Sequence, residues 1–381
     1  HNFSPYYHSE GDIVDNCNME YCSEITRLDL ALLLSVSEKP IPVNQFFLNS
    51  LEDGETLEAS WIVSNETDIV EYEVCFGTDP ENLNEVVVTS STSHQFTGLE
   101  TGTMYYASIC AINELGCKSV DVLKKAKPAV VTLDQGILIV AGSEGGLLDP
   151  LQEDINLFYD SLCYNYVHDF YDATITEEIS LEQIGEYSSI LWHIDNYELI
   201  SSTINDYSYV LRNYLYLGGN VLITGYKPGL VFGAGTYPAS FKAGSLMFDC
   251  FHVAYCKNEA SRLFAGAMEE NLQWPSVYVD SLKMPAFNYH LPWVESLTPT
   301  DDALVLYRYD SKYDTTAQGA YFNHPVGITG AGTNKQAVLL SYPLYYMDFE
   351  QSRQLIYQTM TGLFGEEYLD VEENKLRENK F

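Results

Sequence analysis

Basic residues are scarce in this sequence. Its 381 residues include 19 Lys and Arg against 54 Asp and Glu, which gives a formal net charge of −35. No Lys or Arg occurs between residues 40 and 117 or between residues 128 and 211. Binding to nucleic acid or to an anionic membrane surface requires a basic face. The composition therefore argues against both classes of partner.

Long apolar runs are also absent. No run of about 18 or more apolar residues occurs, so the sequence predicts no membrane insertion. The chain starts at His1, and no charged leader followed by an apolar segment precedes the first expected domain. This favours a mature exported protein, secreted or held at the cell surface, although a shortened chain would look the same.

The cysteines lack the spacing of redox and haem motifs. None of the eight forms CxxC or CxxCH. Two close pairs, Cys17 with Cys22 and Cys250 with Cys256, predict small disulfide-closed loops in an exported protein. Buried, reduced thiols are the alternative.

Residues 40–134 have the pattern of an all-β domain, and residues 1–39 are expected to be a docking arm without a core of its own. Short runs with period-two alternation are separated by turn residues, as in a β-sandwich; they cover residues 57–63, 70–76, 85–88 and 105–111. Alternation places Tyr72, Val74 and Phe76 inward, and it places Cys75 and Cys110 outward.

The segment Leu99-Glu100-Thr101-Gly102-Thr103-Met104-Tyr105 resembles the tyrosine corner of fibronectin type III domains, whose usual form is L-x-P-x-T-x-Y. Thr101 stands where Pro is usual, and Trp61 corresponds to the buried Trp of an early strand. The resemblance implies a sandwich in which the strands around Cys75 and Cys110 are neighbours. A disulfide could then join two of Cys75, Cys110 and Cys117, and the sequence does not choose between them.

Residues 135–366 alternate strand and helix patterns. Strands are expected at 136–142, 164–171, 188–194, 220–225, 303–309 and 336–342, and helices at 150–163, 201–217 and 349–364. Such alternation favours a parallel sheet covered on both faces. The expected fold class is therefore multidomain β plus α/β: a fibronectin type III β-sandwich followed by a doubly wound, mostly parallel α/β sheet domain, with a charged tail at 367–381.

The α/β region resembles the flavodoxin-like, class I glutamine-amidotransferase-like domains of exported bacterial proteins. Four segments carry the resemblance: 136–142, 217–225, 325–328 and 337–344. A working amidotransferase has a Cys nucleophile on a G-x-C-x-G elbow, with His and Glu after a late strand. The elbow position here reads Gly225-Tyr226-Lys227-Pro228-Gly229, and Ser341 to Tyr346 contains no His. The resemblance thus implies a fold without its catalytic triad, and we expect no catalytic residue.

Other candidate sites have ordinary structural explanations. Gly142 to Gly146 is expected to be a turn rather than a phosphate cradle. His193 with Asp195, at the end of an expected central strand, suggests a hydrogen-bonded structural His, with zinc as the weaker alternative. Acidic loops at 149–154 and 177–178 could collect calcium, although solvated carboxylates are the simpler explanation. We expect no other cofactor, and Asn2 and Asn65 are candidate glycosylation acceptors.

Tyrosine is abundant, with 30 residues in several clusters, and its amphipathic ring suits protein interfaces and sugar-binding surfaces. We therefore predict a non-enzymatic structural or adhesive protein, such as a subunit of a filament or surface assembly. Its expected partners are further copies of itself, other surface proteins, or glycans. One alternative is a secreted accessory or hydrolytic protein acting on polysaccharide or peptide, with paired carboxylates in residues 226–300 as acid and base. The other is a glycan- or calcium-dependent binding module.

Overall fold

The computed structural model describes residues 9–11, 13–43, 45–63, 66–142, 149–173, 179–196, 208–233, 235–258, 263–283, 290–313, 321–332 and 336–369. Asn2, Asn65, the 177–178 pair and most of the Gly142–Gly146 turn lie outside these ranges. The chain divides into two compact units. The first comprises His1–Leu48, Ala59–His94 and Tyr105–Lys125, and the second Asn49–Glu58, Gln95–Met104 and Ala126–Phe381. The units cut across the strands of the sandwich, so the expected domain boundaries stay predictions.

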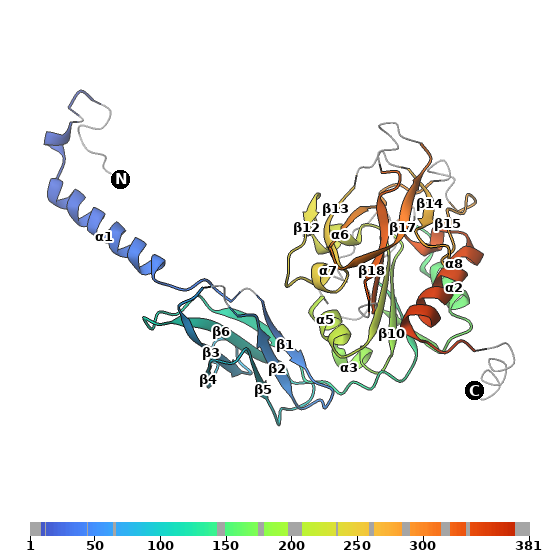
Figure 1. Ribbon diagram of the computed structural model, residues 1–381, viewed down its shortest axis with the longest axis horizontal. Coiled ribbons are helices and arrows are strands. Elements are labelled where there is room, and N and C mark those ends of the chain that lie inside the picture. The colour runs from blue at the N-terminus through green and yellow to red at the C-terminus, as the bar shows by residue number, and fades with distance from the viewer. Residues whose placement is uncertain are drawn as a thin grey trace. The chain divides into compact units, whose positions relative to one another are not determined.

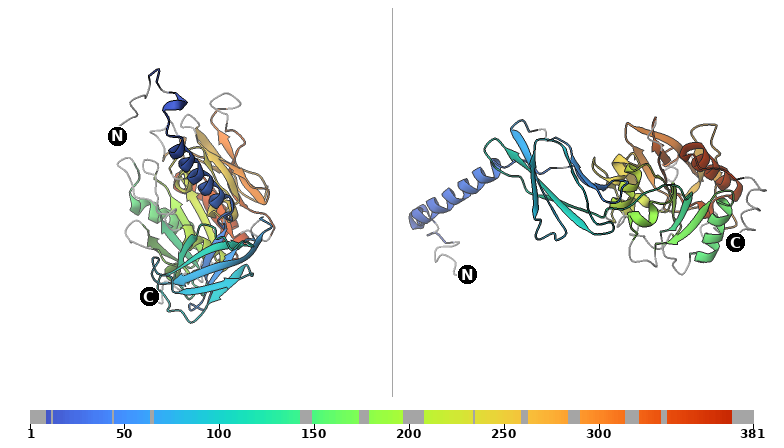
Figure 2. Two further views of the ribbon diagram at one scale, coloured as in Figure 1. Left: turned by 90° about the vertical axis from the view of Figure 1, so that its left-hand side faces the viewer. Right: turned by 90° about the horizontal axis from the view of Figure 1, so that it is seen from below.

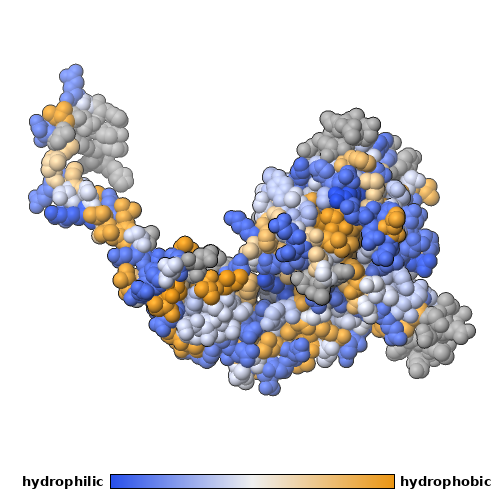
Figure 3. All heavy atoms as spheres, viewed as in Figure 1, coloured by the Kyte–Doolittle hydropathy of each residue, from blue (hydrophilic) through white to orange (hydrophobic). Residues whose placement is uncertain are grey.

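The N-terminal segment forms a helix. A short 3-10 turn, η1 (Val14–Asn16), precedes α1 (Met19–Ser37). Asn18 accepts a hydrogen bond from the Tyr21 amide at 3.0 Å, which satisfies one of the free amides of the first turn. Leucines at 28, 30, 32, 33 and 34 are all more than half exposed. Hydrophobic residues are visible on the surface of this segment in Figure 3. The expected arm is therefore helical, and its docking stays a prediction.

Two β-sheets follow α1. One has the order β1-β2-β5, with β1 (Phe46–Ser50), β2 (Leu57–Trp61) and β5 (Ser93–Phe96). The other has the order β4-β3-β6-β7, with β3 (Ile69–Gly77), β4 (Glu85–Thr89), β6 (Tyr105–Asn113) and β7 (Val122–Ala126). The rings of Trp61 on β2 and Tyr72 on β3 pack edge to face with centroids 5.5 Å apart, so the two sheets share a core. Trp61 is 4% exposed, which confirms its expected burial.

Alternation along these strands predicted most inward residues correctly. Tyr72, Val74 and Phe76 are buried. Cys110 lies opposite Glu73 in the β3–β6 register, which places it on the outer face as expected, but it is buried there. On the same face Lys118, from the turn after β6, binds the Glu73 carboxylate at 2.6 Å.

All eight cysteines lie in the described part of the chain, and all are thiols. Cys75 faces Ser108 across the sheet, so Cys110 is its diagonal neighbour. Diagonal positions lie roughly 7–8 Å apart, too far for a disulfide. A bridge of either to Cys117 is absent as well.

The two predicted loop disulfides are also absent. Cys17 hydrogen-bonds the Ile13 carbonyl at 3.8 Å, while Cys22 lies in the first turn of α1. Cys250 caps the end of a short helix beside Arg212, whereas Cys256 is fully buried on a strand. The members of each pair therefore have different surroundings.

We expect all eight thiols to react with a chromogenic disulfide reagent when the protein is unfolded without reductant. In the native state Cys163 and Cys256 should stay silent because both are fully buried, and Cys110 should react slowly because burial raises its pKa to about 11. The same protein treated with reductant before unfolding is the control. A rise in thiol count after reduction would show that a bridge exists.

The described part of the second unit contains a nine-stranded mixed sheet with the order β15-β14-β17-β18-β19-β11-β10-β8-β9. The parallel strands are β8 (Ile137–Ala141), β9 (His168–Asp172), β10 (Ser189–Ile194), β11 (Asn220–Gly225) and β19 (Ala337–Leu340). Antiparallel pairing extends the sheet through β18 (Pro325–Gly330), β17 (Ala303–Ser311), β14 (Phe264–Glu269) and β15 (Val277–Tyr278). The sheet is thus mixed, and the expected mostly parallel sheet is wrong because hairpins add antiparallel strands at one edge.

A separate small sheet joins β12 (Ala239–Ser240), β13 (Val253–Lys257) and β16 (Ser296–Pro299).

Helices lie on both faces of this mixed sheet (Figure 1). On one face lie α2 (Gln152–Leu162), α8 (Phe349–Tyr357) and the π-helical turn η5 (Gln358–Phe364), and on the other α3 (Leu181–Ile184) and α5 (Ser208–Tyr216). Further short helices are α6 (Pro228–Phe232), α7 (Leu246–Asp249) and the 3-10 turn η4 (Leu344–Tyr346). Ile137 and Ile139 of β8 belong to the core under α2, whereas Leu138 and Val140 belong to the core under α5. Because both faces of such a strand are buried, its sequence is continuously apolar. Figure 2 shows the same domain from two other directions. Among the described residues, no helix combines the length and the apolar character needed to cross a bilayer.

Candidate functional site

The carboxyl ends of β8 and β10 meet where the chain changes direction in the sheet, since β9 lies beside β8 on one side and β10 on the other. Open α/β sheets bind ligands at such positions. His193 is paired with Ala141 across this junction, and Asp195 follows directly after β10. The sequence thus placed this pair correctly.

His193 and Asp195 form a closed hydrogen-bonded cluster, which we call the β10 cluster, with Tyr159 and Tyr345. The Nδ1 atom of His193 lies 2.7 Å from Oδ2 of Asp195. The Tyr159 hydroxyl donates to Oδ1 of Asp195 at 3.1 Å, and the Tyr345 amide donates to the same oxygen at 3.4 Å. The Tyr159 ring stacks on the imidazole with centroids 4.2 Å apart. Both His193 and Asp195 are at most 1% exposed.

The chemistry of the β10 cluster is incomplete for acyl transfer. Burial, followed by the charge of Asp195, raises the pKa of Tyr159 well above its usual value, so the phenol stays a proton donor. Asp195 orients the imidazole as the acid of a Ser–His–Asp triad does. However, among the described residues no hydroxyl or thiol hydrogen-bonds Nε2 of His193. The cluster therefore fits the structural role expected for His193.

The turn between β11 and α6 has the local geometry of a nucleophile elbow. Lys227 has the left-handed values φ 56° and ψ 38°, and α6 starts at the next residue. A Cβ on Gly225 would lie 2.3 Å from the Ile194 carbonyl oxygen, and one on Gly229 would lie 2.1 Å from the Cys256 sulfur. Both glycines are therefore required by close packing, as in a G-x-S-x-G elbow. Lys227 occupies the nucleophile position, and the Tyr226 side chain is buried below it.

The buried carboxylate of Glu295 binds the backbone amides that follow this elbow. The amides of Gly229 and Leu230 donate to its two oxygens at 2.8 and 2.9 Å, and the Tyr237 hydroxyl also donates to it. Glu295 is fully buried, and this desolvation raises its pKa to about 7 against the opposing effect of these hydrogen bonds and of Lys227. Burial lowers the pKa of Lys227, whose ammonium lies 4.8 Å from the centre of the Trp293 ring. The residue after Lys227 is Pro228, which has no backbone N–H, so the elbow lacks the amide that would stabilise an oxyanion in an acyl-transfer enzyme.

Three of the acidic residues described between 226 and 300 are bound to donors. Asp249 pairs with Arg212 at 2.8 Å, Glu270 with Arg308, and Glu295 with the α6 amides. Within the described ranges, no group of three or more His, Cys, Asp or Glu side chains is arranged to hold a metal ion. Glu153 and Asp154 of the acidic loop lie in the first turn of α2.

A hydroxyl does contact an imidazole elsewhere in the unit. Ser296 Oγ lies 2.8 Å from Nδ1 of His324. Burial lowers the pKa of His324, and the nearby Lys257 and Arg308 charges add to this effect. Two cations around the imidazole are the opposite of the carboxylate that orients a triad His.

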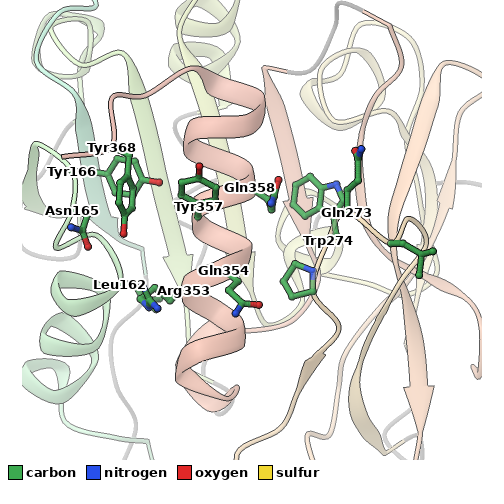
Figure 4. Close-up of a pocket in the computed structure, with 12 residues that line it drawn as sticks. Leu162, Asn165, Tyr166, Gln273, Trp274, Arg353, Gln354, Tyr357, Gln358 and Tyr368 are labelled. Atoms are coloured by element: carbon green, nitrogen blue, oxygen red, sulfur yellow. The ribbon is translucent and has the colours of Figure 1, made fainter. Parts of the chain in front are cut away.

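A pocket of about 460 Å³, which we call the aromatic pocket, opens beside α8. Its described lining comes from the end of α2, the β14–β15 loop, the α8–η5 helix and the C-terminal segment: Leu162, Asn165, Tyr166, Leu272, Gln273, Trp274, Pro275, Arg353, Gln354, Tyr357, Gln358 and Tyr368. In Figure 4, Tyr357 and Gln358 lie between Tyr166 and Tyr368 on one side and Gln273 and Trp274 on the other.

Neither Glu295 nor the aromatic pocket was expected from the sequence. A single acid within the apolar run Leu291-Pro292-Trp293-Val294-Glu295 was the one local indication of a buried carboxylate. Many of the clustered tyrosines are core residues instead of interface residues; Tyr214, Tyr307, Tyr309 and Tyr342 are fully buried.

No family model matches this chain, and no curated protein matches it. Similar solved structures are fibronectin type III domains. FN3tt, in a mutant form, is 24% identical over 23% of this chain and 92% of its own, with a TM-score of 0.21. A Fn3-like protein from Clostridium thermocellum is 20% identical over 23% of this chain and 90% of its own, with a TM-score of 0.19. The fn3 domain of human collagen alpha-1(XX) chain is 17% identical over 25% of this chain and 90% of its own, with a TM-score of 0.21. These similarities do not bear on the glutamine-amidotransferase-like resemblance.

Proposed function

We propose that this chain is a non-enzymatic binding and assembly protein whose α/β unit has kept the frame of an amidotransferase-like domain without its chemistry. The observation that carries the proposal is the closed elbow. Lys227 stands at the nucleophile position, and Glu295 holds the two amides that follow it. Pro228, directly after Lys227, has no N–H to donate to a substrate oxyanion.

The strand order supports the relationship to flavodoxin-like domains. If the parallel strands β8, β9, β10, β11 and β19 are numbered one to five along the chain, their order in the sheet is 2-1-3-4-5. This is the flavodoxin-like order of doubly wound folds. The elbow follows the fourth of these strands, and the β10 cluster follows the third.

Secretion or display at a cell surface is part of the same proposal. The fibronectin-type sandwich and the high acidic charge are compatible with an extracellular setting. The proposed partners are further copies of this chain and other surface proteins. Sedimentation of the purified protein over a wide concentration range tests self-association: concentration-dependent assembly supports it, and a monomer throughout contradicts it.

We expect no hydrolysis of glutamine, chromogenic esters or peptide amides by the purified chain. The physical reason is that nucleophile, base and oxyanion donors are not assembled at one place. Rates should equal those of Lys227→Ala and Ser296→Ala variants, and intact mass should show no adduct with a diazo-oxo-norleucine or fluorophosphonate probe. The Ser240→Ala variant, at an exposed strand position, is the matched control. Turnover that disappears specifically in the Lys227 or Ser296 variant would overturn the proposal.

A further inference from the structure

We infer that the aromatic pocket binds a neutral oligosaccharide. The inference rests on the proposed function in one respect, since it assumes binding without turnover. The volume of about 460 Å³ falls within the range of roughly 300–1,000 Å³ found for small-molecule sites. Four segments distant in sequence build the pocket, and three of them are anchored in the core.

Contacts with neighbouring residues fix the positions of two residues that line the pocket, Tyr166 and Trp274. Tyr166 is 3% exposed, and its hydroxyl lies 3.0 Å from Thr361 Oγ1 of η5. The Trp274 ring packs edge to face against the buried Tyr307 with centroids 5.9 Å apart. η5 is a π-helical turn, and such turns are frequent at functional sites. A ligand therefore meets a surface that is already arranged, which reduces the entropy lost on binding.

Aromatic rings form the apolar part of the pocket. Tyr357 and Tyr368 are 43% and 40% exposed, yet they pack against each other at 5.2 Å with their planes at 85°. Tyr368 also contacts Tyr166 at 5.4 Å. Fixed rings with exposed faces suit the C–H face of a pyranose, and Tyr offers this contact with few rotatable bonds.

Carboxamides form the polar part. The side chains of Gln273, Gln354 and Gln358 line the pocket, and none of the three has a hydrogen bond to another described residue. Each amide both donates and accepts, as each sugar hydroxyl does. The pairing of exposed rings with unengaged amides matches the alternation of C–H faces and hydroxyl edges in a sugar.

The charge of the pocket excludes ionic ligands. Arg353 is the one charged residue of the described lining, and its guanidinium is bound to Glu350 through Nε at 3.1 Å and Nη2 at 2.8 Å. None of the described lining residues is a carboxylate that would attract a cation, and the net charge of −35 repels anions. Neutral glycans fit these conditions, whereas phosphorylated or uronic acid ligands do not.

The test is calorimetric titration of the full chain with neutral hexasaccharides: cello-, malto-, xylo-, manno- and chitohexaose. We expect saturable binding of at least one of them, weakened about tenfold or more by Tyr357→Ala and by Gln354→Ala. Tyr209→Ala is the matched control, because Tyr209 is 37% exposed on α5, on the opposite face of the sheet. Circular dichroism of each variant checks that it is folded.

Three outcomes overturn the inference: no binding of any hexasaccharide, equal losses in the Tyr209 and Tyr357 variants, or binding of a peptide library that depends on Tyr357 while no sugar binds. Chromatography of the titrated sugars separates this inference from the proposed function. Cleaved sugar would contradict the non-enzymatic proposal while leaving the binding site intact. Absence of binding without cleavage would contradict the site alone.

Discussion

Replacing Asp195 by alanine is expected to lower the free energy of unfolding by about 3–5 kcal/mol, because it breaks a buried hydrogen-bonded cluster. The carboxylate accepts hydrogen bonds from the Tyr159 hydroxyl and the Tyr345 amide, and it contacts Nδ1 of His193. Tyr159 and His193 are fully buried, so water does not replace the acceptor that they lose. Urea unfolding followed by circular dichroism measures the effect.

Two further variants make this measurement specific. Asp195→Asn keeps the shape and one acceptor oxygen, so its loss should be clearly smaller. Asp301→Ala removes an exposed carboxylate in a turn and should change the unfolding free energy by less than about 0.5 kcal/mol. If Asp195→Ala lowers the free energy of unfolding by no more than Asp301→Ala does, then the β10 cluster does not stabilise the fold.

The stability of the elbow is expected to depend on pH through Glu295. Burial raises the pKa of this carboxyl from 4.5 to about 7. A raised pKa in the folded state means that the contribution of Glu295 is complete below pH 4.5 and is lost as the pH rises through 7. The interval between the two values corresponds to about 3 kcal/mol.

The difference in unfolding free energy between the natural protein and Glu295→Gln, followed from pH 4 to 8, isolates this effect. Glutamine is neutral throughout, so its own cost is constant and only the Glu295 titration changes the difference. We expect the natural protein to lose about 3 kcal/mol relative to the variant across this interval. Glu85→Gln, at an exposed strand position, should give a flat difference. If the difference for Glu295→Gln is also independent of pH, then the Glu295 carboxyl has the same pKa in the folded and unfolded states, and the prediction is wrong.

Several local features could be predicted because they depend on neighbours in sequence. Alternation identified Val74 and Phe76 as core residues, and the resemblance to fibronectin type III domains made the burial of Trp61 expected. Alternation also predicted the face of Cys110 correctly, but not its burial, because the pattern of one strand does not show what packs on its outer face. The disulfides were expected from cysteine spacing, but a bridge depends on the approach of two Cβ atoms, which spacing does not fix.

The expected parallel pairing is found for β8, β9, β10, β11 and β19, whereas the strand expected at 303–309 is antiparallel to its neighbours. Apolar runs such as Ile137–Ala141 indicate a strand buried on both faces, whatever its neighbours are. The pairing of β17 with β18 and β14 depends on hairpins within residues 264–330. A strand pattern does not reveal the direction of its partner, so the mixed sheet was missed.

The sequence by itself determined the elbow at Gly225–Gly229, because two glycines and a proline within five residues specify a tight strand-to-helix turn locally. It also determined that no Cys or Ser stands at the nucleophile position. Only the tertiary structure decided what lies against that turn, since Glu295 reaches the Gly229 amide across 66 positions of the chain. The aromatic pocket likewise exists only after four separate segments have packed together. Local conformation follows from the steric and hydrogen-bonding preferences of adjacent residues, whereas the burial that shifts the pKa of Glu295 arises from contacts with no trace in the local pattern.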